Sequence, residues 1–276
     1  MANEKEATKE KNLTLQIDCP LILLREDEIH LWLCPHDNAG DPMMEGALRS
    51  LLTAEELSKQ ARFHFVADRY RYLLTRALVR TVLSRYVPVH ANAWRFAHGP
   101  FGRPHIQAPN VEEGRTLNFN LSHSDGLVVL ALARNIDIGV DAEYIENAPV
   151  LDADHFFSPT EARALRALPS TQQSERFFEL WTLKESYVKA NGMGLQIPLD
   201  SFSFALDDIG TIGFSILNAD ENAQRWKFWQ FQPTGEHMVA LCAALGKSNA
   251  KRVVCREIAP LQWERPLEIR MTRTSA

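Results

Sequence analysis

The sequence is poor in cysteine and has no cysteine pair at the spacing of a metal or redox motif. The four cysteines are Cys19, Cys34, Cys242 and Cys255. Their scatter excludes a zinc motif and a disulfide scaffold, and it favours a reducing compartment. An excess of positive charge is also missing, since 30 Lys and Arg oppose 35 Asp and Glu, for a formal net charge of −5. A nucleic-acid partner is therefore not expected, because it would require many neutralised phosphates.

Long hydrophobic runs are missing as well. The longest run, residues 127–133, is far shorter than the roughly 18 residues that cross a membrane. Residues 1–12 are rich in Glu, Lys and Ala and lack the hydrophobic region of a secretory signal. We therefore expect a cytoplasmic protein with no membrane partner, in which residues 1–12 form a disordered, solvated tail.

The material that is present is ordinary for a globular protein, with 45% hydrophobic and 24% charged residues. A chain of 276 residues can form one large domain or two modest ones, each with its own core. The G-x-S-x-G elbow, the P-loop and the G-x-G-x-x-G motif are all missing. The chemistries that depend on those motifs are therefore not proposed.

Several segments carry helix signals. Thr53 and Ser158 are each followed by Glu at the third position, which is the signature of a capping box at a helix start. Apolar spacings of three and four predict a helix over residues 67–86, and a further helix is expected over residues 175–190. Residues 199–245 show strand and turn patterns instead.

Three strands are predicted in the middle of the chain. Residues 117–122 alternate between apolar and polar side chains, which is typical of a half-buried strand. Residues 126–133 and 136–145 follow as two further strands. We expect these two to pair as a hairpin through Arg134-Asn135.

The helix over residues 67–86 lies in a basic stretch of an acidic chain. Between Lys59 and Arg85 there are seven basic residues and one acid, Asp68. An anion-binding site and a solvated helix face explain this cluster equally well.

Two carboxylates lie close together on the third predicted strand. Because strand side chains alternate, Asp141 and Glu143 project from one face, about 6–7 Å apart, while Val140 and Ala142 point into a core. Such carboxylates repel each other unless a cation lies between them. Mg²⁺ prefers one or two carboxylates plus substrate phosphates. Taken alone, however, two carboxylates at this spacing lie more often on a solvent-exposed strand face than at a metal site.

The helix over residues 175–190 carries a second polar group. Glu185 and Lys189 are i, i+4 neighbours. They form either an ion pair at the surface or a functional pair. In the functional pair, Glu185 is a metal ligand or a general base, and the ammonium of Lys189 lies beside a phosphate. Lys184 falls within the apolar stripe, where an unpaired ammonium is costly, and in the surface-pair interpretation its ammonium snorkels to solvent.

A serine and a histidine end the strand over residues 117–122. Ser122 and His123 are adjacent in sequence, so their side chains diverge and cannot act as a nucleophile and its base. We interpret His123 as a phosphate contact.

Together and in this order, these elements resemble the Sfp-type 4′-phosphopantetheinyl transferases. The resemblance covers about residues 50–245, and the order and spacing of its motifs are highly specific. The matching segments are Arg62-Phe63, residues 68–74, Phe101-Gly102-Arg103-Pro104, residues 119–124, 138–143, 156–161 and 181–185, Lys189, and residues 192–195.

The resemblance implies an α+β fold of two similar subdomains related by pseudo-two-fold symmetry, with the active site in the cleft between them. Residues 13–135 would form the first subdomain and residues 136–247 the second, and residues 248–276 would be a C-terminal extension without an assigned role. The chain would supply both halves and act as a monomer. It would transfer 4′-phosphopantetheine from coenzyme A to a serine of apo acyl or peptidyl carrier proteins, and release 3′,5′-ADP.

The resemblance also implies catalytic roles. Asp141, Glu143 and Glu185 would ligate Mg²⁺, or Mn²⁺ in its place, and the ion would grip the pyrophosphate of coenzyme A. Glu185, directly or through a metal-bound water, would take the proton from the carrier serine. Lys189 would stabilise the departing 3′,5′-ADP. The expected catalytic residues are therefore Asp141, Glu185 and Lys189.

The other implied contacts hold coenzyme A. They come from Lys59, Arg71, Arg103, Ser122, His123 and Lys189. Arg103 stands where the family often has lysine, which keeps the charge and changes the hydrogen-bond geometry. Two rival functions remain open: a carrier-binding module that has lost catalysis, and a Mg²⁺-dependent phosphodiesterase or pyrophosphatase that uses water as nucleophile.

Overall fold

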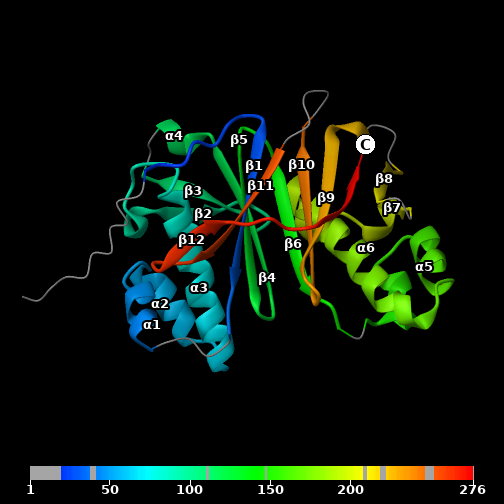
Figure 1. Cartoon of the computed structure of the whole chain (residues 1–276), viewed down its shortest axis with the longest axis horizontal. Helices are drawn as coiled ribbons and strands as arrows, with labels where there is room; N and C mark the ends of the chain where they lie inside the picture. The colour runs from blue at the N-terminus through cyan, green and yellow to red at the C-terminus, as the bar shows by residue number, and fades with distance from the viewer. Residues whose placement is uncertain are drawn as a thin grey trace, which may run out of the picture.

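Two sheets lie side by side in the middle of the molecule, and the long helices cover their outer sides (Figure 1). The arrangement is seen in a computed structural model. It describes residues 20–37, 42–109, 112–146, 148–207, 210–217, 222–245 and 252–275. The tail expected over residues 1–12 lies outside these ranges. No helix in the described ranges is long and apolar enough to span a membrane.

The first sheet has five strands in the order β12-β11-β1-β5-β4, and the helices beside it come from the first half of the chain. Its strands are β1 (Glu28–Pro35), β4 (Leu117–Ser124), β5 (Leu127–Arg134), β11 (Arg252–Ala259) and β12 (Trp263–Pro266). The helices beside it are α1 (Pro42–Arg49), α2 (Ala54–Ala61), α3 (Val66–Leu83) and α4 (Glu112–Arg115). A separate hairpin consists of β2 (Arg95–His98) and β3 (Pro104–Ala108).

The second half builds a six-stranded sheet in the order β6-β10-β9-β13-β8-β7. Its strands are β6 (Ile138–Tyr144), β7 (Phe202–Leu206), β8 (Thr211–Ile216), β9 (Trp226–Thr234), β10 (His237–Ala244) and β13 (Met271–Ser275). Its helices are α5 (Pro159–Arg166) and α6 (Ser170–Asn191). Each half therefore repeats one arrangement, a long helix on the outer face of a sheet, which confirms the predicted α+β fold of two subdomains.

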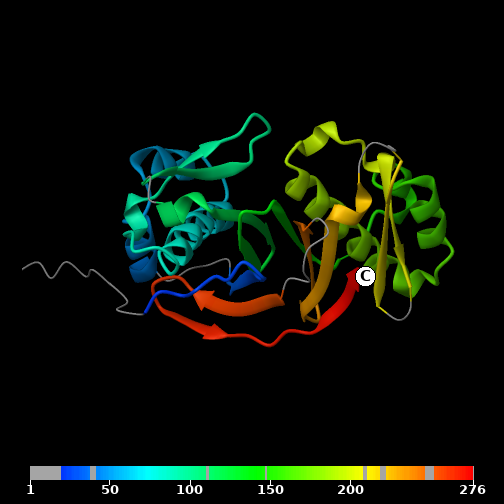
Figure 2. The same cartoon turned by 90° about the horizontal axis from the view of Figure 1, so that it is seen from above.

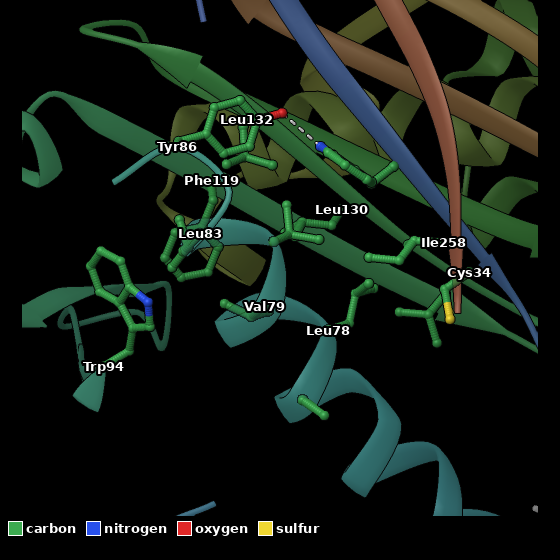
Figure 3. Close-up of a cluster of buried hydrophobic side chains, with 14 of the residues drawn as sticks. Cys34, Leu78, Val79, Leu83, Tyr86, Trp94, Phe119, Leu130, Leu132 and Ile258 are labelled. Atoms are coloured by element: carbon green, nitrogen blue, oxygen red, sulfur yellow. Dashed lines mark hydrogen bonds between the residues drawn. The ribbon is translucent and has the colours of Figure 1, made fainter. Parts of the chain in front are cut away.

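The central strands are apolar on both faces because each face is buried. On β5, Leu130 and Leu132 pack toward α3, as Figure 3 shows, whereas Val129 and Ala131 pack toward the second sheet. Three cores result: one under α3, one between the sheets and one under α6. The run over residues 127–133 is apolar throughout for this reason.

The predicted helix starts are confirmed. Both capping boxes are present, with reciprocal hydrogen bonds between Thr53 and Glu56 at α2 and between Ser158 and Glu161 at α5. The two long predicted helices correspond to α3 and α6.

The predicted hairpin between residues 126–133 and 136–145 is wrong. β5 pairs with β4, whereas β6 crosses to the second sheet and pairs antiparallel with β10. The two sheets meet at their edge strands, β4 and β6, where side-chain amides replace the backbone ladder. Asn118 Nδ2 donates to the carbonyl oxygen of Ile136 over 2.6 Å, and the amide of Val140 donates to Asn120 Oδ1 over 2.9 Å.

The C-terminal segment, to which the sequence assigned no role, belongs to both halves. β11 pairs parallel with β1 in the first sheet, and β13 pairs with β9 and β8 in the second. Figure 2 shows this segment, orange to red, passing beneath both halves. It therefore links the two sheets through strand pairing.

Candidate active site

Helix α6 lies directly against strand β6 because residue 139 has no side chain. A Cβ atom at Gly139 would stand 2.1 Å from the carbonyl oxygen of Ser186 and 2.4 Å from the amide nitrogen of Ala190. Any larger residue would push the helix away from the strand. This contact places Glu185 and Lys189 of the helix next to Asp141 of the strand.

A pocket of about 330 Å³ opens at the seam between β4, β6 and α6. It brings together six of the predicted site residues, namely Ser122, His123, Asp141, Glu143, Glu185 and Lys189. The strand alternation predicted from sequence is confirmed, because Asp141 and Glu143 line this pocket while Val140 and Ala142 are buried between the sheets.

Asp141 is the centre of a hydrogen-bond network. Its Oδ1 atom accepts from Lys189 Nζ over 2.6 Å and from Ser122 Oγ over 2.9 Å. Lys189 Nζ also donates to Ser122 Oγ over 3.0 Å and to the carbonyl oxygen of Val140 over 3.2 Å. Lys189 therefore pairs with a buried aspartate of another element, and a surface pair with Glu185 is not formed.

The surroundings of the other two carboxylates, Glu143 and Glu185, disfavour their ionised forms. Trp181 Nε1 donates to Glu143 Oε1 over 3.0 Å, yet burial, together with the negative charge of Asp141, raises the pKa of Glu143 to about 7. Burial and Asp141 likewise raise the pKa of Glu185. Because the three carboxylates repel one another, a cation in addition to Lys189 would stabilise their ionised forms.

The chemistry of these donors suits Mg²⁺, because carboxylate oxygens are among its preferred protein ligands. Asp141 Oδ2 is buried and has no hydrogen-bond partner in the described chain, so one carboxylate oxygen is free for a ligand. Within the same ranges, no group of three or more Asp, Glu, His or Cys side chains is arranged so that it could hold a metal ion by itself. Mg²⁺ does not require such a group, because it is commonly bound by one or two carboxylates together with phosphate and water oxygens.

Arg103 borders a second pocket that adjoins the first and shares Leu121, Glu185 and Lys189 with it. Its guanidinium donates to Asp137 Oδ1 over 3.2 Å, and to the carbonyl oxygens of Ala190 and Ile138 over 3.3 Å each. These bonds fasten the loop before β3 to the second half of the chain, beside the pocket.

The structure separates the two remaining basic residues. Arg71 pairs with Asp68 and lies near His123, whose pKa is lowered by desolvation and then by the charge of Arg71. Lys59 does not line the carboxylate pocket. It lies in another pocket, over the ring of Tyr72.

Known proteins with similar sequences match both halves. Residues 42–135 match the family described as "4′-phosphopantetheinyl transferase, N-terminal", and residues 137–242 match the "4′-phosphopantetheinyl transferase superfamily". The 4′-phosphopantetheinyl transferase HetI of Nostoc sp. is 36% identical over 189 residues, which are 68% of this chain and 78% of HetI. The chain belongs to the 4′-phosphopantetheinyl transferase family.

Two further relatives extend the match. The transferase Sfp of Bacillus subtilis is 33% identical over 195 residues, which are 71% of this chain and 83% of Sfp. A putative 4′-phosphopantetheinyl transferase of Synechocystis sp. is 27% identical over 248 residues, covering 86% of this chain and 96% of the relative. The resemblance seen in the sequence is thereby confirmed, and the chain is a transferase.

Both halves of the transferase contribute to its pocket. Ser122 and His123 come from the region of the N-terminal match, whereas Asp141, Glu143 and Glu185 come from the second. Trp181, which was not among the predicted site residues, lines the pocket and donates a hydrogen bond to Glu143. Its position on the i, i+4 ridge with Glu185 and Lys189 was the available signal.

The interpretation in which Lys184 snorkels to solvent is wrong. Its side chain is fully buried and pairs with Glu161 over 2.9 Å. Its Nζ also donates to the carbonyl oxygens of Leu199 and Phe202, over 2.6 and 2.8 Å. With three oxygen partners inside the core, the ammonium does not need to reach solvent.

Proposed function

We propose that this transferase moves 4′-phosphopantetheine from coenzyme A to a serine hydroxyl of an apo acyl or peptidyl carrier protein, releases 3′,5′-ADP and depends on Mg²⁺. The convergence of Asp141, Glu143, Glu185 and Lys189 in one pocket carries the proposal. One chain supplies both walls of that pocket, so we also propose that the enzyme works as a monomer, and we expect it in the cytoplasm.

Asp141, Glu143 and Glu185 would hold the Mg²⁺ ion, and Mn²⁺ could replace it. The free Oδ2 atom of Asp141 and the raised pKa values of the two glutamates support this assignment. When bound, the ion neutralises charge on the pyrophosphate of coenzyme A during the displacement.

The protein's own groups would then carry the proton and orient the phosphates. Glu185 takes the proton of the carrier serine, whose oxygen bonds to the phosphorus next to the pantetheine. The bond from that phosphorus to the bridging oxygen breaks, and 3′,5′-ADP leaves with the electron pair. Lys189 stabilises the negative charge on the leaving group.

The remaining polar residues would bind phosphate oxygens. Ser122 and His123 line the pocket, Arg103 lines the adjoining pocket, and Arg71 lies near His123. The exposed Lys59 would reach coenzyme A from farther away.

Mass spectrometry of an apo carrier protein tests the proposal. We expect a gain of one phosphopantetheine when the carrier is incubated with enzyme, coenzyme A and Mg²⁺, no gain in EDTA, and recovery when Mg²⁺ is restored. Release of nucleotide without a change in the carrier would show a hydrolase instead. Binding of the carrier with neither product would show a module without catalysis.

A further inference from the structure

The two sheets meet beside the active-site pocket without strand pairing. β4 and β6 belong to different sheets, so no backbone ladder joins them within the described ranges. The side chains of Asn118 and Asn120 bridge them instead, and the amide N–H of Val140 donates to Asn120 Oδ1 over 2.9 Å. Elements that touch through side chains slide past one another more easily than paired strands do. The relative position of the two halves at the pocket therefore depends on contacts outside this seam.

The C-terminal segment, residues 252–275, passes beneath both halves (Figure 2). It places β11 and β12 in the first sheet and β13 in the second. Between β12 and β13, the partly buried Leu267 and Ile269 pack against the core between the sheets. The segment lies outside both family matches, the second of which ends at residue 242. It therefore contacts both halves, and the family resemblance assigns it no role.

In the first half, the segment holds the end of α3. Arg85, which follows that helix, binds Glu264 of β12 through two hydrogen bonds, Nε to Oε2 over 2.9 Å and Nη2 to Oε1 over 3.1 Å. Arg256 of β11 donates to the same Oε1 atom over 3.1 Å. The side chains of Arg85 and Glu264 are 11% and 13% exposed. A two-point pair that is mostly shielded from water is stronger and better oriented than a surface pair.

In the second half, the segment holds α6 through a second carboxylate between two arginines. Arg273 of β13 donates from Nε to Glu179 Oε1 over 2.9 Å, and Arg176 of α6 donates to Oε2 over 2.7 Å. The side chains of Arg273 and Glu179 are 12% and 10% exposed. Glu179 lies on the helix that carries Glu185 and Lys189. The segment is therefore attached to the helix that supplies one wall of the pocket.

We propose that the C-terminal segment is a positioning element for the transfer reaction, and that its pairs at Glu264 and Arg273 hold the two halves where both walls of the pocket contact one coenzyme A. This inference rests on the proposed function. His123 comes from one half and Asp141 from the other, so a change in the angle between the halves separates them. A displacement of about 1 Å in such a site can lower the rate about 10²-fold. Glu264 and Arg273 would act through the pocket residues and touch no substrate.

Amide hydrogen exchange, measured by NMR on the intact protein without coenzyme A, tests the attachment. The amide of Val140 reports directly on the seam, because it donates across it to Asn120. In Arg273→Ala and in Glu264→Gln its exchange should accelerate at least about tenfold, as expected when a charged hydrogen bond that closes the seam is lost. The amide of Leu130, on the central strand β5, should exchange at the parent rate.

Arg176→Ala is the matched control. It removes the other arginine from Glu179 but leaves the bond to Arg273, so the Val140 amide should exchange as in the parent. Arg273→Lys keeps the charge and should recover most of the protection that Arg273→Ala loses. The proposal would be overturned by parent-like exchange at Val140 in both segment variants. Equal acceleration at Val140 and Leu130 would also overturn it, since that result shows only a general loss of stability.

Steady-state transfer links the segment to the reaction. Arg273→Ala should raise the KM for coenzyme A about tenfold and change kcat less than about twofold, because saturating coenzyme A draws the two halves together again. Arg176→Ala should leave both constants unchanged. An unchanged KM in Arg273→Ala would overturn the positioning role. The exchange measurement needs no substrate, so an inactive parent with accelerated exchange in the segment variants would contradict the proposed function and not the attachment.

Discussion

Lys189 on α6 donates a hydrogen bond of 2.6 Å to Oδ1 of Asp141 on β6. The aspartate side chain is 4% exposed and the lysine side chain 27%. The pair therefore joins the helix that carries Glu185 to the strand that carries Glu143, and it leaves Oδ2 of Asp141 free. The network fixes the positions of the lysine and of the Asp141 carboxylate.

Asp141→Ala and Glu185→Gln should each abolish transfer while the protein remains folded. Each removes a ligand oxygen or a proton acceptor from the reacting groups, so we expect kcat/KM to fall by at least about 10³-fold. Lys189 is partly exposed, so water can solvate its ammonium when Asp141 is replaced. Transfer assays and circular dichroism check both points, and near-normal turnover in either variant would remove the residue from the proposed mechanism.

The metal-free protein should lose stability as pH rises toward neutrality. The pKa of Glu143 is about 7 in the folded protein, above the ordinary 4.5, so folding favours its protonated form. Its contribution is complete below about pH 4.5 and is lost as pH rises through 7. We therefore expect Glu143→Gln, compared with the parent in EDTA, to raise the Tm at pH 8 and to change it little at pH 5. Parallel pH profiles for the two proteins would contradict this.

Lys184→Ala should lower the free energy of unfolding without a direct effect on the transfer reaction. Glu161 is also fully buried, and it would remain as a buried charge without its cation. Loss of one partner of such a pair costs about 3–5 kcal/mol. Urea denaturation measures the loss of stability. Lys189→Ala is the matched control, because Lys189 is partly exposed, and it should lower the free energy of unfolding by less. Equal losses in the two variants would contradict the role given to burial.

Gly139→Ala should damage both stability and transfer. The added methyl group would meet the backbone of α6 at Ser186 and Ala190, so the helix must move away from β6. Overpacking of this kind costs about 1–3 kcal/mol or more. Gly46→Ala on α1 is the control, because nothing lies within 4 Å of the added atom. A parent-like Tm and transfer rate for Gly139→Ala would show that close contact of α6 with β6 is not required.

Local patterns in the sequence predicted which of these side chains share a face, and the family resemblance assigned them to one site. Strand alternation placed Asp141 and Glu143 on one face, and helical spacing placed Glu185 and Lys189 on one ridge. These patterns need only the geometry of a single strand or helix. The capping boxes were predicted for the same reason, since each joins residues three apart.

Long-range relationships were not predicted. The strand after Asn135 pairs with β10, about a hundred residues later, and no local pattern distinguishes that partner from the adjacent β5. The partners of Lys184 come from α5, from the segment before β7 and from the first residue of β7, and β11 and β13 join different sheets. Such pairings depend on which buried groups find partners in the complete fold.

The most direct test of the central claim is the anomalous diffraction of Mn²⁺ in crystals grown with coenzyme A. We expect one manganese peak within coordination distance, about 2.0–2.3 Å, of oxygens from Asp141, Glu143 and Glu185 and of the coenzyme A pyrophosphate. A peak bound elsewhere, or coenzyme A bound with its pyrophosphate away from these three carboxylates, would contradict the account.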